Sequence, residues 1–243
     1  MRAAGNMIRW GPESARTGRW RADGSVALLV PVPDGRPASS EFVRRCLHLL
    51  AEQGFQRVVT AALPPDEQHG FLEAGFVVHE QLHLLALDKA LPLPPLPPEP
   101  KLRRAGPVRK TGALEVDAAA FSPFWRLARA GRKEALAATP QRRLRVVLDG
   151  DRRVTGYAIC GASGGRGFVQ RLAVTPAAQG HGLGKRLLLD GLYWLRGLGT
   201  YQIAVNTQHG NETALALYRQ VGFREDPAGL CVLSAGLDAS MVG

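Results

Sequence analysis

The stretch VTPAAQGHGLGKRLLLDGL, residues Val174 to Leu192, decides the fold of the second half of this 243-residue chain. It places glycine at every second position from 180 to 184, directly ahead of a leucine-rich run. In and after that run Leu183, Leu187 and Leu195 recur at helical spacing, which predicts a helix that ends near 197 or 199. The glycines therefore lie in the turn that leads into a helix.

The start of a helix is a place where an anion can bind. Its first four N–H groups have no partner within the helix, and the helix dipole adds about half a positive charge. Glycines at 180, 182 and 184 lack the β-carbons that would keep a diphosphate away, and Lys185 adds charge. A Walker loop requires glycine at Gln179, and a dinucleotide fingerprint requires glycine at Lys185, so neither fits. A tight turn alone needs only one glycine, so we expect a diphosphate of another kind.

The segments around this loop alternate between strand-like and helix-like patterns. Asp149 and Gly150 form a turn signal between two apolar runs, which predicts a hairpin. Asn211 is a preferred helix N-cap, and Gly222 stands where a left-handed C-cap is expected. Together these patterns predict a mixed sheet with helices on both faces. The expected strands are 109–116, 145–148, 154–160, 167–174, 201–205 and a final antiparallel pair from 223 onward and at 230–237. The expected helices are 121–138, the leucine-rich helix that ends near 197 or 199, and the helix between Asn211 and Gly222.

Two motifs in this half resemble a known family. The loop QGHGLG, residues 179–184, looks like the Q/R-x-x-G-x-G/A loop of the GCN5-related N-acetyltransferase (GNAT) superfamily. It follows LAVTP, residues 172–176, as that family's loop follows a strand. NETALALYRQVGF, residues 211–223, resembles the family's asparagine, helix, tyrosine and glycine-phenylalanine ending. The resemblance covers about residues 108–243 and implies an α/β (α+β) fold with a mixed, mainly antiparallel GNAT-like sheet flanked by helices.

The first half repeats the same order of elements more weakly. Strands are expected at 25–32, 58–62 and 81–88, and helices at 41–53 and 67–74. FLEAGFVVHEQLHLLALD, residues 71–88, parallels LYRQVGFREDPAGLCVLSAGLD, residues 217–238, which indicates an internal duplication. The loop DGRPASS at 34–40 lacks the alternating glycines. This arrangement is similar to tandem GNAT proteins such as mycothiol synthase, here with a degenerate first copy.

A proline-rich segment separates the two halves. It reads KALPLPPLPPEPKLRRAGP, residues 89–107, in which proline is too frequent for a helix or an interior strand. We interpret it as a semi-rigid linker, with a ligand for a proline-recognising domain as the alternative. The predicted organisation is a degenerate GNAT-like domain without a diphosphate loop at 1–88, the linker at 89–107, and an acetyl-CoA-binding GNAT domain at 108–243.

The resemblance implies an N-acetyltransferase that moves an acetyl group directly from acetyl-CoA to a primary amine. It implies that the strand at 167–174 separates from the strand at 201–206, so that the pantetheine arm can bond its backbone. Tyr218 stands at the family's tyrosine position, where its phenol would protonate or steady the coenzyme A sulfur; a core tyrosine is the alternative. Asn211 is also explained as a simple helix cap. The implied cofactor-binding residues are Leu172, Ala173, Val174, Gln179, Gly180, His181, Gly182, Leu183, Gly184, Lys185, Asn206 and Asn211.

No general base can be assigned from the sequence. Many relatives place a glutamate on the strand before the loop, whereas GFVQRLAV, residues 167–174, has no carboxylate. Glu115, Asp117 and His209 are candidates from flanking segments, with solvated surface positions as the alternative, and an ordered-water relay is another route. Gln170 and Arg171 are candidates to face the acceptor. The acceptor amine and the oligomeric state stay open, because acceptor pockets in this fold come from variable loops.

Two alternatives to an enzyme remain, one indicated by the charge and the other by the missing carboxylate. Residues 1–88 carry nine basic and ten acidic side chains, whereas residues 108–243 carry eighteen basic and ten acidic ones. The segments QRRLRVV and DRRV make a basic nucleic-acid-binding protein one alternative, although no aromatic residues alternate with these arginines as on a stacking platform. The missing carboxylate makes a catalytically inactive CoA-binding regulator the other.

Cysteine spacing and hydropathy limit the remaining classes. Cys46, Cys160 and Cys231 lie far apart without a CxxC pair, so we expect reduced, buried thiols and no metal site. The most apolar early stretch, 25–33, is too short for a membrane span or signal peptide and ends in prolines. We therefore expect a cytoplasmic protein whose partners are acetyl-CoA and an amine acceptor, and neither a membrane nor nucleic acid.

Overall fold

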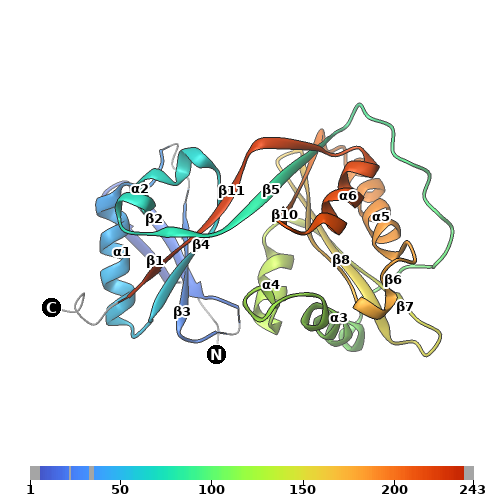
Figure 1. The fold of residues 1–243 in the computed structure, drawn as a ribbon, viewed down its shortest axis with the longest axis horizontal. Coiled ribbons are helices and arrows are strands. Elements are labelled where there is room, and N and C mark those ends of the chain that lie inside the picture. The colour runs from blue at the N-terminus through green and yellow to red at the C-terminus, as the bar shows by residue number, and fades with distance from the viewer. Residues whose placement is uncertain (1–5, 22, 33–35, 238–243) are drawn as a thin grey trace. The chain divides into compact units, whose positions relative to one another are not determined.

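The chain forms two compact units of mixed α/β structure. The structure is a computed structural model that describes residues 6–21, 23–32 and 36–237 (Figure 1). The first unit comprises Met1–His83, Gln208–Gly210 and Pro227–Gly243, and the second comprises Leu84–Thr207 and Asn211–Asp226. The chain therefore leaves the first unit and returns to it, so each unit is built from more than one segment.

The first unit is a mixed sheet with two helices. Its strands follow the order β1-β2-β3-β4-β11, in which β3 and β4 are parallel and the other neighbours antiparallel. Its core contains Phe42 and Leu50 of the first helix packed on the strands. The hairpin β1–β2 is an addition that the sequence patterns did not indicate. The bounds are β1 (Asn6–Trp10), β2 (Glu13–Arg19), β3 (Val26–Pro31), α1 (Ser40–Glu52), β4 (Arg57–Leu63), the 3-10 turn η1 (Pro65–Glu67), α2 (His69–Glu73), and parts of β5 (Val77–Asp88) and β11 (Arg224–Gly236).

The C-terminal strand differs from the expectation of a final antiparallel pair. β11 is one continuous strand, and its last residues pair with β4 from Cys231 opposite Leu63 to Gly236 opposite Arg57. The segment DPAG at 226–229 looks like a turn signal. The strand nevertheless runs through it, with the unusual backbone confined to Gly229 at φ 58°. The expected pair was therefore wrong.

The second unit contains the predicted glycine loop. Its strand order is β5-β10-β9-β8-β7-β6, with β9 and β10 parallel and β9 to β6 antiparallel. Tyr157 and Ile159 pack against α3 and α4, whereas Cys160 packs against α5 and α6, so the two helix pairs cover opposite faces (Figure 1). The bounds are β6 (Arg103–Arg104), α3 (Pro107–Ala120), η2 (Pro123–Trp125), α4 (Arg129–Ala137), β7 (Gln141–Leu148), β8 (Val154–Ser163), β9 (Arg166–Val174), η3 (Pro176–Ala178), α5 (Leu183–Gly197), β10 (Gln202–Gln208) and α6 (Glu212–Val221).

Two elements before β7 were predicted wrongly. Residues 109–116 are helical instead of extended, as part of α3, and residues 121–138 form a 3-10 turn and the short helix α4 instead of one helix. The buried stripe of α3 contains Ala113, Val116 and the carboxylate Asp117, so its apolar periodicity is interrupted. Pro123 then prevents the residues around it from continuing a helix.

The three cysteines all lie within the described residues and are free thiols. Cys46 and Cys160 are buried free thiols, and Cys231 is half-buried. Burial raises the pKa of both the Cys46 and the Cys160 thiol to about 12. No helix in the described residues is long and apolar enough to cross a membrane.

Candidate active site

Strands β9 and β10 separate partway along their length. Their parallel pairing joins Gln202–Ala204 to Arg166–Phe168 and extends no further. Close to that point β9 carries a bulge, because Ile159 of β8 pairs with Arg171 while the next residue, Cys160, pairs with Val169. Gln170 is therefore an extra residue, and such bulges increase twist and end pairing locally. The expected separation of the two strands is confirmed.

The glycine loop follows β9 and leads into α5. Gly180 and Gly182 have φ values of 80° and 75°, in the left-handed region that favours glycine. Gly182 is the N-cap of α5 and supplies no side-chain cap, and Arg186 N donates to Gly182 O at 3.0 Å. The amides of Leu183 to Lys185 precede that first helical bond, so they have no acceptor within the helix.

The side chain of Gln179 fixes the loop to β9. Gln179 Nε2 donates to Val174 O at 3.1 Å, and the backbone N–H of Gln179 donates to Pro176 O at 3.3 Å. The ring of His181 is exposed, and its Nδ1 lies 2.8 Å from Gln179 O. Gln179 thus holds the loop against the end of β9. The backbone amides that could bind a ligand are therefore those from Gly180 onward.

Helix α1 of the first unit begins differently. Its N-cap is Ser39, whose Oγ accepts from Phe42 N at 3.2 Å. The carboxylate of Glu13 accepts from Ser39 N and from Ser39 Oγ, each at 2.7 Å. A carboxylate of the chain therefore lies at the start of this helix, where a bound anion would be stabilised. Of the loop expected at 34–40, residues 34 and 35 lie outside the described residues.

Tyr218 of α6 lies in the core of the second unit. Its side chain is 5% exposed, and its ring centroid is 5.7 Å from that of Phe223. Burial raises the pKa of the phenol, and the nearby Cys160 raises it further. The phenol therefore stays protonated near neutral pH and is a hydrogen-bond donor.

The remaining residues of the predicted cofactor site lie on β9, on β10 and at the start of α6. Ala173 and Val174 are buried, and Leu172 is half-buried. Asn206 is exposed on β10, beyond the residues that pair with β9. Asn211 Oδ1 accepts from Ala214 N at 3.2 Å, so Asn211 does cap α6. This cap uses only the oxygen of the side-chain amide.

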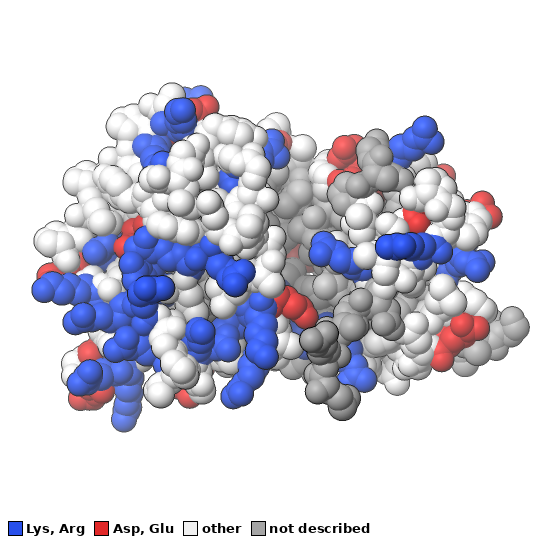
Figure 2. All heavy atoms as spheres, turned by 180° about the vertical axis from the view of Figure 1, so that it is seen from behind, with Lys and Arg blue, Asp and Glu red and all other residues white. Residues whose placement is uncertain are grey.

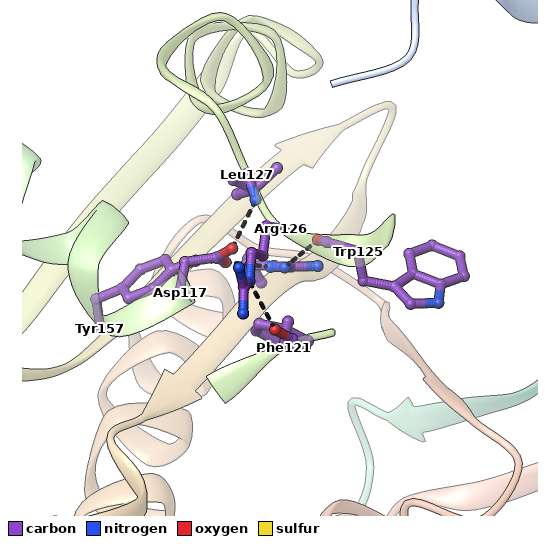
Figure 3. A network of polar contacts seen from close by, with 7 residues as sticks. Asp117, Phe121, Trp125, Arg126, Leu127 and Tyr157 are labelled. Carbon is purple, nitrogen blue, oxygen red and sulfur yellow. Dashed lines mark hydrogen bonds and ion pairs between the residues drawn. The ribbon is translucent and has the colours of Figure 1, made fainter. Parts of the chain in front are cut away.

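Asp117, a candidate base with a solvated position as its alternative, is instead completely buried. Its carboxylate accepts from Tyr157 Oη at 2.5 Å and from Leu127 N at 2.6 Å (Figure 3). It also accepts from Arg171 Nε at 2.8 Å. A carboxylate engaged in this way is a structural anchor and is poorly placed to take a proton from an acceptor.

Arg171, expected to face the acceptor, holds the loop between α3 and α4. Its Nη2 donates to Trp125 O at 2.6 Å, and its guanidinium lies 3.5 Å from the centroid of the Phe121 ring. Arg126 Nε donates to Phe121 O at 3.1 Å within the same loop (Figure 3). Sequence reasoning missed this network, because isolated polar residues form no motif. The available signal was Asp117 on the buried stripe of α3.

The other candidate polar residues occupy separate positions. Glu115 is exposed on α3, and His209, in the first unit, stacks on His83 with ring centroids 4.1 Å apart. Gln170 Oε1 is buried and has no hydrogen-bond partner among the described residues. A buried acceptor of this kind costs free energy unless water or a ligand bonds it. Within the same described ranges, no group of three or more His, Cys, Asp or Glu side chains could hold a metal ion.

The site combines the start of α5, which has no side-chain cap, with two strands that separate beside it. Residues 113–223 match the model of the Acetyltransferase (GNAT) family. That range runs from α3 to the end of α6 and includes β9, the loop and Tyr218. Residues 113–223 are thus similar to the GNAT family of acetyltransferases.

Several curated relatives are named mycothiol acetyltransferase. The one from Pseudarthrobacter chlorophenolicus is 44% identical over 57 residues, which cover 24% of this chain and 18% of the relative. The one from Mycobacteroides abscessus is 44% identical over 59 residues, which cover 24% and 20%. The chain therefore matches about a fifth of the length of these relatives.

Solved structures share the fold at low sequence identity. A tandem GNAT protein from the clavulanic acid biosynthesis pathway has a TM-score of 0.68 at 16% identity, covering 96% of this chain and 82% of that one. A GCN5-related N-acetyltransferase from Sphaerobacter thermophilus has a TM-score of 0.65 at 15% identity, covering 93% and 77%. These neighbours establish a mixed α/β, GNAT-like fold.

Proposed function

We propose that the second unit binds acetyl-CoA and transfers its acetyl group directly to a primary amine. The observation that carries the proposal is that two features meet at one end of β9. The amides that enter α5 lack caps, and the pairing with β10 ends after Phe168. The first feature suits a diphosphate, and the second leaves backbone groups for an amide-bearing arm. The family match over residues 113–223 supports the same function.

The proposed cofactor site has three parts. The loop amides bind the diphosphate, while Lys185 adds positive charge and Gln179 holds the loop in place. The backbone of β9 bonds the pantetheine arm, although Val174 O already accepts from Gln179 Nε2. Asn206 and Asn211 contribute side-chain amides from the opposite strand and the start of α6. The full set is Leu172, Ala173, Val174, Gln179, Gly180, His181, Gly182, Leu183, Gly184, Lys185, Asn206 and Asn211.

The chemistry requires groups at the carbonyl oxygen and at the sulfur. The acceptor nitrogen bonds to the carbonyl carbon as the carbon–sulfur bond breaks; the nitrogen gives up a proton and the sulfur gains one. A backbone N–H of Ala173 or Val174 donates to the carbonyl oxygen as charge develops there. Tyr218 donates a hydrogen bond to the sulfur. Because burial raises the pKa of this phenol, holding the proton in a hydrogen bond is favoured over releasing it.

We propose that ordered water removes the proton from the amine. A side-chain amine has a pKa of about 10.4 and must be neutral to react. Asp117 is committed to Arg171 and Tyr157, and is therefore not assigned this role. Gln170 Oε1, which is buried without a partner in the described part of the chain, is an acceptor that can orient such a water.

The first unit is proposed to be a degenerate copy that supports the second. The start of α1 carries both a serine cap and the carboxylate of Glu13, which would repel a diphosphate. For the acceptor, the relatives named mycothiol acetyltransferase make mycothiol-related amines the first compounds to assay.

Substitution of Gly182 tests the cofactor site. Both Gly182→Asp and Gly182→Asn place a short capping side chain at this left-handed residue, and Asp and Asn tolerate that backbone. Only Asp adds a negative charge where the diphosphate is proposed to bind. We expect the Asp variant to bind acetyl-CoA at least about tenfold more weakly than the Asn variant by calorimetry. Equal affinities would contradict the site.

Acetyl transfer is then measured separately, as release of the coenzyme A thiol with a panel of amines. Release that depends on both acetyl-CoA and an amine supports the enzyme. Tight acetyl-CoA binding without transfer to mycothiol-related amines, aminoglycosides or peptides would instead favour the CoA-binding regulator.

A further inference from the structure

The outer edge of the sheet in the second unit is only partly covered. β6 contains two residues, Arg103 and Arg104, which pair with Val146 and Arg145 of β7. β7 starts at Gln141, so its first residues pair with β8 on one side and, in the described chain, with no strand on the other. Such an edge exposes backbone donors and acceptors that can pair with another extended chain.

A cavity of about 440 Å³ lies along this open edge. Residues 142–145 of β7 line it, and so does Arg104, the last residue of β6, which pairs with Arg145. Leu136 and Lys110, from α4 and α3, line it on one face of the sheet, and Trp194, from α5, lines it on the opposite face. The cavity therefore spans the plane of the sheet, which is where the next strand would lie.

The walls of this cavity are strongly cationic. Arg143 Nη2 lies 3.1 Å from Asp190 Oδ1, and Arg145 Nε lies 3.7 Å from Asp190 Oδ2. Two guanidinium groups thus share one carboxylate, and positive charge remains in excess. The guanidinium of Arg143 also lies 5.7 Å from the ring centroid of Trp194. The lining as a whole includes five basic residues, Arg104, Lys110, Arg142, Arg143 and Arg145.

One face of the second unit has the same character. In the space-filling view, Lys and Arg side chains gather over the face of the second unit and outnumber the Asp and Glu side chains there (Figure 2). A second cavity, near the hairpin that joins β7 to β8, is also lined by basic residues, including Lys101, Arg103 and Arg109. A field of one sign draws in partners of the opposite sign.

We propose that the open edge of β7 binds an extended, acidic peptide segment of a partner protein, which pairs with Arg142 to Leu144 as an additional strand. The backbone edge recognises an extended chain, and successive side chains of that chain would point alternately to the two faces of the sheet. On one face they meet Lys110 and Arg142, and on the other Arg143 and Arg145. This site shares no residue with the proposed acetyl-CoA site and does not depend on it.

A nucleic acid is the competing polyanion, and the geometry favours the peptide. A phosphate backbone can accept from the N–H groups of a strand edge but has no donor for its C=O groups, whereas an extended peptide pairs with both. Binding of a single strand of nucleic acid also relies on rows of stacking aromatic side chains. Trp194 is the sole aromatic residue among those described that line the cavity.

The test is fluorescence anisotropy with the full chain and a fluorescein-labelled peptide of about eight residues, in which pairs of glutamates alternate with pairs of valines so that both faces of the strand carry carboxylates. We expect this peptide to bind. We expect N-methylation of alternate backbone amides to weaken binding at least about tenfold, because it removes strand pairing but leaves the charge. A lysine-valine peptide of the same length should not bind. The proposal is overturned if the glutamate peptide does not bind at about 1 mM, if N-methylation has no effect, or if a labelled RNA of about 12 nucleotides binds more tightly.

A matched pair of charge variants locates the site. Arg104→Glu with Arg142→Glu changes two exposed lining residues, and Lys133→Glu with Arg153→Glu makes the same charge change at two exposed residues outside the lining. We expect the first variant to weaken peptide binding at least about tenfold and the control by less than about twofold. Equal losses in the two variants would show a diffuse charge effect and overturn the site. Thermal melts of both variants verify that they are folded.

Discussion

Tyr218 is the one side chain to which the proposed mechanism assigns a direct role at the sulfur. Replacing it with Phe keeps the buried ring and removes only the donor. We expect turnover to fall about 10²- to 10³-fold, the usual contribution of a hydrogen-bond donor to a developing charge, with acetyl-CoA affinity within about twofold. Steady-state kinetics and calorimetry measure the two quantities. Tyr193→Phe, which alters an exposed tyrosine of α5, serves as the control. Unchanged turnover in Tyr218→Phe would remove the phenol from the mechanism.

We expect Asp117 to contribute to the stability of the folded protein, with no direct part in acetyl transfer. Asp117→Ala leaves the guanidinium of Arg171 without its carboxylate at a site that is 12% exposed, and loss of one partner of a buried ion pair costs about 3–5 kcal/mol. Urea denaturation should show a loss of that size in the free energy of unfolding. Glu115→Ala, at an exposed position of the same helix, should change it by less than about 0.5 kcal/mol. Normal stability with lost turnover would instead identify Asp117 as a base.

At the scale of elements, Gly191 is the point where α5 packs against Cys160 of β8 with no room for a side chain. A β-carbon on Gly191 would lie 2.5 Å from Cys160 Sγ and 3.8 Å from Cys160 Cβ. We expect Gly191→Ala to destabilise the protein by about 1–3 kcal/mol. Adding Cys160→Ala removes the clashing sulfur, so the double variant should recover most of that loss. Gly197→Ala, where a β-carbon meets no atom within 4 Å, is the control. Equal thermal shifts for the two glycine variants would contradict the close contact.

The same elements show what the sequence could and could not predict. β9, α5 and α6 were predicted closely, because glycines and an asparagine mark their ends and leucines mark their buried faces. α3 was mistaken for a strand because Asp117 interrupts its apolar stripe. The separation of β9 from β10 followed from the family resemblance. The partners of Arg171 come from residues 46 to 54 positions away in the chain, and no local pattern encodes contacts at that distance.

At the scale of the whole molecule, the chain cannot be divided cleanly at its proline-rich segment. A fragment of residues 101–243 lacks Leu85 and Leu87, which are buried in the core of the second unit. The fragment also keeps Val232 and Leu233 of β11 but lacks β4, the strand with which β11 pairs. We therefore expect fragment 101–243 to aggregate on size exclusion and to lack a cooperative thermal transition, whereas fragment 84–226 melts cooperatively. A well-behaved fragment 101–243 with full acetyl transfer would show that the first unit is dispensable.

The pairing of β11 with β4 also constrains how the protein is made. A ribosome produces Arg57–Leu63 well before their antiparallel partners Cys231–Gly236. Domains usually fold in the order in which they are synthesised. Here the sheet of the first unit stays one strand short until the second unit has been synthesised, so the unit that is begun earlier is completed later.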